Sequence, residues 1–163
     1  MLITLKNKEF LILDDFIIKC AIGKNGIKLK KKEGDKTTPS GVFSISKLYY
    51  RADRVKKPLT KIPTKIITRN MGWCDDPKSK YYNMEILINK NIKHEKLYRK
   101  DNLYNYLMVI DYNIKKIIPY KGSAIFIHLT KSYKQTAGCL AINQTDFLIL
   151  AKLVSKRCKL KIC

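Results

Sequence analysis

The most informative part of the sequence is residues 124–139, AIFIHLTKSYKQTAGC, in which an apolar run leads through a polar segment to a Gly-Cys pair. The apolar half is rich in β-branched and aromatic residues and predicts a buried strand. His128 lies in this strand, and Cys139 follows eleven residues later. A thiol attacks carbonyl carbon as its thiolate, which a neighbouring imidazole promotes near neutral pH. The pattern favours a Cys/His acyl-transfer site. The alternative is that Cys139 is a small buried apolar residue and His128 a core histidine.

Short apolar runs on both sides of this stretch also have the character of strands. Charged residues or Asn separate them, as expected for a meander. Only the C-terminal part has helical periodicity, over residues 147–154, with Asn143 or Thr145 as the cap. A shorter helical turn is expected near residues 94–97. The sequence thus predicts a mainly β, compact sandwich or barrel with a few short helices and a C-terminal helix. Strands are predicted at residues 2–5, 10–13, 16–21, 42–50, 104–112 and 124–129.

The length and composition predict a single domain over residues 1–163. A chain of 163 residues, 45% of them hydrophobic, can bury one substantial core. The sequence contains no repeat, low-complexity stretch or Pro/Gly/Ser-rich linker that would divide it. It also contains no apolar run long enough to cross a bilayer. We expect a monomer without a transmembrane segment.

The formal net charge of +21 raises the question of nucleic-acid binding, because cationic surfaces attract polyanions. Only five of the 34 basic residues are arginines, the residue type best suited to phosphates and base edges. The lysines are spread over the chain, and the densest run, residues 28–32, fits a solvated turn. Specific nucleic-acid binding is therefore not expected. A basic surface would still hold the protein near anionic cell-envelope polymers.

The five cysteines do not form a recognisable framework. Their odd number and wide spacing argue against a set of disulfides, and no Cys-x-x-Cys or Cys/His cluster has zinc-binding spacing. We therefore expect neither a metal nor another cofactor. At least one thiol must stay outside any disulfide within the monomer, which fits a nucleophile. The cysteines are Cys20, Cys74, Cys139, Cys158 and Cys163.

Four separated segments resemble the bacterial L,D-transpeptidase catalytic domain, also called the YkuD-type domain. In order and spacing they extend over about residues 20–150, nearly the whole chain. The resemblance implies a compact, mainly β fold in which Cys139 accepts an acyl group from a peptidoglycan stem peptide. The segments are GDKTTPSGVF (34–43), GWCDDP (72–77), GSAIFIH (122–128) and TAGC (136–139).

The resemblance also implies roles for the residues around Cys139. His128 would act as the base, and the backbone carbonyl of Leu129 would accept the other N–H of its ring. Backbone N–H groups near Cys139 would bind the oxyanion, where Gly138 allows the substrate to approach closely. An acceptor amine would produce a cross-link by L,D-transpeptidation. With water the protein would be an L,D-carboxypeptidase or a cross-link hydrolase of the same fold. From a different class, a non-catalytic wall-binding or nucleic-acid-binding basic module is the less favoured alternative.

The resemblance places the protein in the bacterial cell envelope, the periplasm, where peptidoglycan stem peptides would be its partners. The first twenty residues do not have the pattern of a secretory signal, because Glu9, Asp14 and Asp15 interrupt the apolar runs. Cytoplasmic action on wall fragments is therefore the alternative.

The chain also departs from the family pattern. Many family members have His before the Gly-Cys pair and Arg shortly after it, whereas this chain has Ala137 and then Leu140-Ala141. The interval from His128 to Cys139 is also short for the family. These changes leave the nucleophile and base in place, so we expect a divergent branch with its own substrate-binding residues. The candidates are Tyr50, Arg51, Trp73, Asp75, Asp76, His94 and Thr136.

Several of these candidates have an equally plain structural explanation. Asp75 and Asp76 could bind the amine of a diamino acid, but Asp-Asp-Pro is also ordinary turn chemistry. Trp73 could be a core residue, and Arg51 could bind a carboxylate or be an exposed surface arginine. His94 could line the cleft or be a solvated surface histidine. The adjacent Cys74 could be a second reactive thiol or a buried structural residue.

Overall fold

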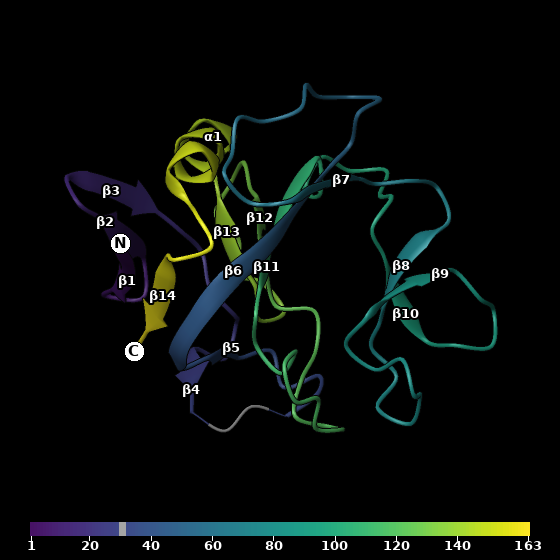
Figure 1. The fold of residues 1–163 in the computed structure, drawn as a ribbon. Coiled ribbons are helices and arrows are strands. Elements are labelled where there is room, and N and C mark those ends of the chain that lie inside the picture. The colour runs from purple at the N-terminus through teal and green to yellow at the C-terminus, as the bar shows by residue number, and fades with distance from the viewer. Residues whose placement is uncertain (30–31) are drawn as a thin grey trace.

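The computed structural model describes residues 1–29 and 32–163, and within them it has fourteen strands and one helix (Figure 1). The mainly β class predicted from the sequence is confirmed. The helix α1 spans Gln144–Leu153, between β13 and β14. The strands are β1 (Leu2–Lys6), β2 (Phe10–Leu13), β3 (Phe16–Lys19), β4 (Ile27–Lys28), β5 (Thr38–Pro39), β6 (Gly41–Tyr50), β7 (Thr64–Ile66), β8 (Met71–Cys74), β9 (Glu85–Leu87), β10 (His94–Lys96), β11 (Tyr106–Ile110), β12 (Phe126–Leu129), β13 (Leu140–Ile142) and β14 (Lys159–Ile162).

Nine of the described strands form one large sheet that curves into a nearly closed barrel. Along this sheet the order is β13, β12, β11, β6, β14, β1, β2 and β3, and β7 pairs separately with β6. β13 and β3 are therefore the two edges. Beyond β3, Ala21 exchanges two backbone hydrogen bonds with Ala141 of β13, at 2.8 and 2.9 Å. This bridge joins the edges and places residues 20–24 beside the segment that leads into β13.

The barrel core follows from the alternation of side chains along the strands. β1 buries Ile3 and Leu5, and the parallel strand β14 buries Leu160 and Ile162, whereas the intervening residues lie nearer the solvent. The apolar side of α1, including Phe147, packs into the same core. One helical stripe and the inner faces of the strands thus share a single apolar interior.

β11 and β12 are buried throughout because both of their faces are covered. One face contributes to the barrel core, and the other packs against a small sheet of β10, β8 and β9. The Trp73 ring of β8 meets the Phe126 ring of β12 edge-on, with 5.1 Å between centroids. Tyr49 of β6 donates a hydrogen bond to Glu85 of β9 at 2.5 Å. Figure 1 shows the small sheet on the side of the molecule away from β1, β2, β3 and both chain ends.

Most of the local predictions agree with these elements. The six predicted strands correspond to β1, β2, β3, β6, β11 and β12, with ends that differ by at most two residues. Asn143, not Thr145, caps α1, because its side chain accepts a hydrogen bond from the Asp146 N–H at 2.9 Å. The helical turn predicted near residues 94–97 is wrong. His94–Lys96 forms β10 because it pairs antiparallel with β8.

Two further expectations from the sequence concern the basic run 28–32 and membrane-spanning segments. Lys30 and Lys31, at the centre of the basic run 28–32, lie outside the described residues. Among the helical residues that the structure describes, none belongs to a helix long and apolar enough to cross a membrane.

Candidate active site

His128 and Cys139 line the same cleft, which has a volume of about 1160 Å³. His128 belongs to β12 and pairs with Ala141 of the parallel strand β13. Cys139 lies two residues before Ala141, and side chains two residues apart in extended chain share a face of the sheet. The strand pairing therefore places the imidazole and the thiol on the same side of the sheet, although Cys139 lies eleven positions after His128 in the sequence.

The His128 ring is buried and held in one orientation. Only 7% of this residue is exposed, and Nδ1 lies 2.9 Å from the backbone oxygen of Leu129. A carbonyl oxygen can only accept, so Nδ1 carries the proton and Nε2 keeps its lone pair in the neutral ring. Burial lowers the pKa of His128 from its ordinary value, which the bond to Leu129 partly offsets. The imidazole is therefore a neutral base at neutral pH.

Cys139 is buried against a backbone segment with an unusual conformation. Its Sγ donates a hydrogen bond to the carbonyl oxygen of Ala124 at 3.3 Å. Ala124 has a φ of 53°, in the left-handed region that residues with a Cβ seldom adopt. The side chain of Asn83 stabilises this conformation, because its Oδ1 accepts a hydrogen bond from the Ala124 N–H at 3.0 Å. Asn83 also donates to two carbonyl oxygens, at 3.1 and 2.8 Å.

Two threonine hydroxyls fix the loop that carries Cys139. Thr136 Oγ1 donates to the Cys139 carbonyl at 2.7 Å and accepts from the Gly138 N–H at 3.0 Å. Thr38 Oγ1, fully buried, donates to the Gly138 carbonyl and accepts from the Gly23 N–H, both at 2.9 Å. Gly138 has a φ of 139°, which favours glycine at this position. Thr38 and Gly23 were not among the candidates, although Thr38 lies in the GDKTTPSGVF segment.

Three carboxylates from distant parts of the chain line the cleft. Glu33 accepts hydrogen bonds from Tyr82 and from Ser123, the latter at 2.8 Å, and Glu95 accepts one from Tyr104. Asp75 Oδ2 lies 3.9 Å from the ammonium of Lys93. Its Oδ1 is buried and, among the described residues, has no hydrogen-bond partner. We refer to Glu33, Asp75 and Glu95 as the acidic wall.

The acidic wall concentrates negative charge in a chain whose formal net charge is +21, and two of its carboxyl groups, those of Asp75 and Glu95, have shifted pKa values. Burial raises the pKa of Asp75, and Lys93 opposes this shift. Burial also raises the pKa of Glu95, whereas the hydrogen bond from Tyr104 opposes it. The neighbouring carboxylates of the wall raise both pKa values further. A positively charged group entering the cleft would relieve this repulsion.

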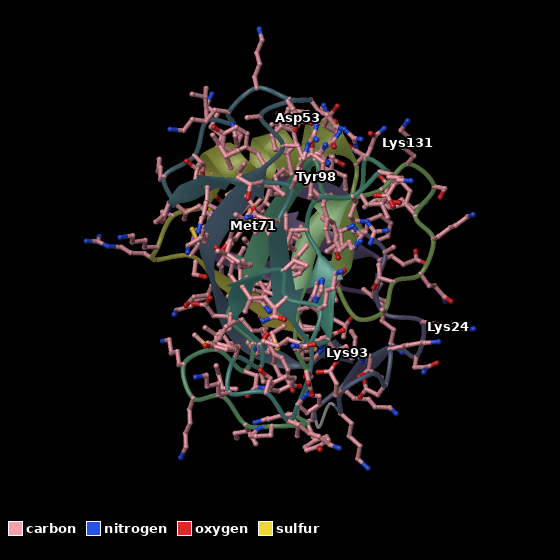
Figure 2. The ribbon with its side chains drawn as sticks, turned by 90° about the vertical axis from the view of Figure 1, so that its right-hand side faces the viewer. Lys24, Asp53, Met71, Lys93, Tyr98 and Lys131 are labelled. Atoms are coloured by element: carbon pink, nitrogen blue, oxygen red, sulfur yellow. The ribbon has the colours of Figure 1, made fainter. Side chains whose placement is uncertain are left out.

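Arg51 and Tyr50 lie outside the cleft lining. Arg51 is 2% exposed and forms a two-pronged ion pair with Asp53, at 2.8 and 2.7 Å. It also donates to the Arg99 carbonyl at 2.8 Å and stacks on Tyr98 at 3.4 Å from the ring centroid. Figure 2 shows Asp53 and Tyr98 together at the top of the molecule, where the Tyr98 hydroxyl donates to Asp53. The Tyr50 ring packs into the barrel core.

Trp73, Asp76 and His94 also lie outside the cleft lining. Trp73 is a core residue whose Nε1 donates to Asn83 Oδ1 at 3.0 Å. Asp76 forms a turn, accepting from the Lys78 N–H at 3.0 Å. The Nδ1 of His94 is bonded to the Ile92 carbonyl at 2.7 Å. Of the substrate-binding candidates, the structure thus brings Asp75 and Thr136 to the cleft.

The cleft lining also includes basic residues. Lys93 and Lys131 both line it. Figure 2 shows them well apart, with Lys131 near the top of the view and Lys93 below the centre. Within residues 1–29 and 32–163, no group of three or more His, Cys, Asp or Glu side chains is placed to hold a metal ion.

A β-rich domain that presents a buried histidine and a cysteine to one large cleft has the layout of a catalytic domain. The family model of the L,D-transpeptidase catalytic domain, YkuD, matches residues 4–162, and the chain belongs to this family. Domains of this family act on peptidoglycan peptides in the cell wall. A comparison with curated proteins finds no match.

Proposed function

We propose that residues 1–163 form one L,D-transpeptidase domain in which Cys139 is the nucleophile and His128 the base. The observation that carries this proposal is the 2.9 Å bond from His128 Nδ1 to the Leu129 carbonyl, in a cleft that Cys139 also lines. The bond leaves Nε2 as the proton acceptor. A neutral buried imidazole beside a thiol is the arrangement that nucleophilic catalysis by cysteine requires.

The proposed reaction has two steps. Cys139 Sγ attacks the carbonyl carbon between the third and fourth residues of a stem peptide, and His128 takes the thiol proton. The C–N bond breaks as His128 returns this proton to the leaving amine, which leaves a thioester. In the second step an acceptor amine attacks the thioester carbon, a new C–N bond forms and the C–S bond breaks, and His128 passes the proton of the amine to the departing thiolate, which restores the thiol.

The loop around Cys139 supports the oxyanion of each tetrahedral intermediate in this proposal. Backbone N–H groups near the nucleophile stabilise developing negative charge when they are fixed in advance. The hydroxyls of Thr136 and Thr38 fix this loop from two sides. Because the Gly138 N–H is bonded to Thr136, Gly138 contributes chiefly through its φ of 139° and its lack of a side chain.

Asp75 is the substrate-binding residue that we favour. It lines the cleft, and its buried Oδ1 has no hydrogen-bond partner among the described residues. The ammonium of a diamino acid in a stem peptide would supply both a hydrogen-bond donor and the opposite charge. Asp76 does not line the cleft, because its carboxylate accepts a hydrogen bond from the Lys78 N–H in the turn.

The size of the cleft fits a reaction that involves two stem peptides. Pockets for single small ligands have volumes of about 300–1,000 Å³. A cleft of about 1160 Å³ has room for a donor stem peptide and part of an acceptor. An L,D-carboxypeptidase or cross-link hydrolase of the same fold is the second candidate, in which water replaces the acceptor amine. In either case we place the protein in the bacterial cell envelope, where its charge of +21 would favour anionic polymers.

Intact-protein mass spectrometry with a purified disaccharide-tetrapeptide tests the proposal. We expect a thioester adduct on the wild type and on Cys74→Ala, but not on Cys139→Ala. Cys74 is the matched control because it is fully buried and lies outside the cleft lining. Cross-linked dimer among the products would favour transfer, and tripeptide alone would favour hydrolysis. Neither adduct nor product, or equal turnover by Cys139→Ala, would refute the cysteine mechanism.

A further inference from the structure

Tyr104 packs directly against the proposed base. It lies two residues before β11, is 5% exposed and lines the cleft. Its ring meets the His128 ring in an edge-on arrangement, with centroids 5.4 Å apart and planes at 61°. It meets Phe126, two residues before His128 in β12, at 6.1 Å and 90°. The phenol thus borders the face of β12 that carries the base.

Two charged residues hold the Tyr104 ring in this position. The guanidinium of Arg99 lies over the ring, 5.0 Å from its centroid. The hydroxyl donates a hydrogen bond to Glu95 of β10. Burial raises the pKa of Tyr104 well above its ordinary value, so the phenol keeps its proton and remains a donor. Tyr104 therefore joins the small sheet to the strand that carries His128.

The contact between the Tyr104 and His128 rings shields the imidazole from water. The Leu129 carbonyl fixes Nδ1 of His128 but does not by itself exclude water from the ring. The aromatic ring of Tyr104 covers part of the imidazole, and burial is the main reason that the pKa of His128 is lowered. An aromatic pair of this geometry also restricts the ring orientation.

We propose that Tyr104 is a positioning residue whose ring keeps His128 dry and correctly oriented. The inference rests on the proposed function, in which His128 is the base. Tyr104 acts through His128 and is not itself assigned a proton transfer. The role differs from the residues singled out in the sequence, because Tyr104 lies in none of the four segments that resemble the family.

Three substitutions separate the parts of this role. Tyr104→Phe keeps the ring and removes the hydroxyl, Tyr104→Leu removes the ring, and Tyr104→Met fills a similar space with a flexible chain. The Met variant serves the same purpose if the Leu variant fails to fold. Tyr49→Phe is the matched control, because Tyr49 is 1% exposed, also donates to a glutamate of the small sheet, and lies outside the cleft lining.

The first readout is the titration of His128 by NMR, which does not depend on activity. The chain has only two histidines, so His94 serves as the reference in the same spectra. In the Leu and Met variants we expect the pKa of His128 to rise toward about 6.5, because water reaches the ring. In Tyr104→Phe and Tyr49→Phe we expect it to stay near the wild-type value. A His128 titration unchanged in every folded Tyr104 variant would overturn the proposal.

The second readout is the rate of thioester formation as a function of pH. We expect Tyr104→Leu to be slower by about tenfold to a hundredfold, with the loss of activity on the acidic side moved to higher pH. Tyr104→Phe should form the thioester at most of the wild-type rate. A Leu variant as fast as the wild type, with the same pH profile, would refute the role. If the wild type itself forms no thioester, the proposed function fails, whereas the NMR titration still decides the contact between Tyr104 and His128.

Discussion

The ring of His128 donates from Nδ1 to the backbone carbonyl of Leu129, the next residue in the same strand, at 2.9 Å. A bond between sequence neighbours needs no distant partner, so the orientation of the proposed base is built into β12. In the proposed mechanism this bond replaces the carboxylate that orients the histidine in many catalytic triads. Because a carbonyl oxygen cannot donate, this bond selects the tautomer with its lone pair on Nε2.

His128→Ala should therefore slow thioester formation by about two to four powers of ten, because the cysteine loses its general base. The measurement is single-turnover mass spectrometry of the Cys139 adduct. His94→Ala is the matched control and should react like the wild type, since His94 lies outside the cleft lining and its Nδ1 is bonded to the Ile92 carbonyl. A similar loss in both variants would indicate a general effect on the fold and contradict the assignment.

The stability of the protein should depend on pH through His128. Burial lowers the pKa of the folded residue, whereas the unfolded residue titrates near its ordinary value of about 6.5. As the pH falls through this value the unfolded chain takes up the proton first. The contribution of His128 is thus fully present above about pH 6.5 and is lost below it.

Urea unfolding of the wild type and His128→Asn at about pH 7.5 and about pH 5.5 measures this effect. Asn keeps a polar side chain that does not titrate. We expect the wild type to lose more unfolding free energy between the two pH values than the variant does. Equal losses would show that His128 titrates alike in the folded and unfolded chains.

Thr38→Val should destabilise the protein by about 1–3 kcal/mol and reduce activity. It would leave the Gly23 N–H and the Gly138 carbonyl, both now bonded to Thr38 Oγ1 at 2.9 Å, without their buried partner. Thr37→Val is the matched control. Thr37 is also fully buried, but its hydroxyl has no hydrogen-bond partner among the described residues. In thermal unfolding, the melting temperature of Thr37→Val should equal or exceed that of the wild type. Similar losses of stability in Thr37→Val and Thr38→Val would contradict this account.

The sequence was sufficient for six of the fourteen described strands and for proposing His128 and Cys139 as a pair, because both depend on local patterns. The apolar run of β12 and the Gly-Cys pair are visible within residues 124–139. The acidic wall could not be predicted in the same way. Its residues come from positions 33, 75 and 95. Asp75 and Glu95 reach the cleft with the small sheet that packs against β11 and β12, whereas Glu33 comes from the segment before β5. Asp75 was predicted from the GWCDDP segment, whereas Glu33 and Glu95 have no sequence signal of their own.

In the segment after β6, the sequence suggested a substrate-binding role for a residue that the structure shows in an internal ion pair. Arg51 has the residue type that binds substrate carboxylates, and sequence alone cannot reveal that Asp53, two residues later, occupies its guanidinium. The strand β10 was missed for a related reason. Three residues, His94–Lys96, carry too little periodicity to indicate a strand, and their pairing with β8 fixes their conformation.

Arg51→Lys should lower the melting temperature with little effect on KM. A lysine cannot keep the two-pronged pair with Asp53, the bond to the Arg99 carbonyl and the stacking on Tyr98 together. We expect a loss of about 2 kcal/mol in unfolding free energy. Arg54→Lys, at an exposed position on the same segment, should change the melting temperature less. A large rise in KM with unchanged stability would instead place Arg51 in substrate binding.

Asp75→Asn should weaken recognition of a donor peptide that carries a free ammonium. The substitution keeps the shape of the side chain and removes its charge, so a charge-assisted hydrogen bond worth about 1.5–3 kcal/mol is lost. This corresponds to about a tenfold to hundredfold fall in kcat/KM. Asp76→Asn is the matched control, because Asp76 is the next residue and its carboxylate accepts from the Lys78 N–H in the turn.

A comparison of two donor peptides, one with a free ammonium and one acetylated at that amine, tests whether the ammonium is the group that Asp75 binds. Acetylation of the diamino acid removes the positive charge, so the wild type should lose activity on the acetylated donor while Asp75→Asn loses little more. The effects of the two changes should therefore not add. Because burial raises the pKa of Asp75, its preference for the charged donor should fade at a higher pH than for an ordinary aspartate as the solution is acidified. Additive losses would mean that Asp75 and the ammonium do not meet, and the carboxylate would then act on the cleft through Lys93 instead.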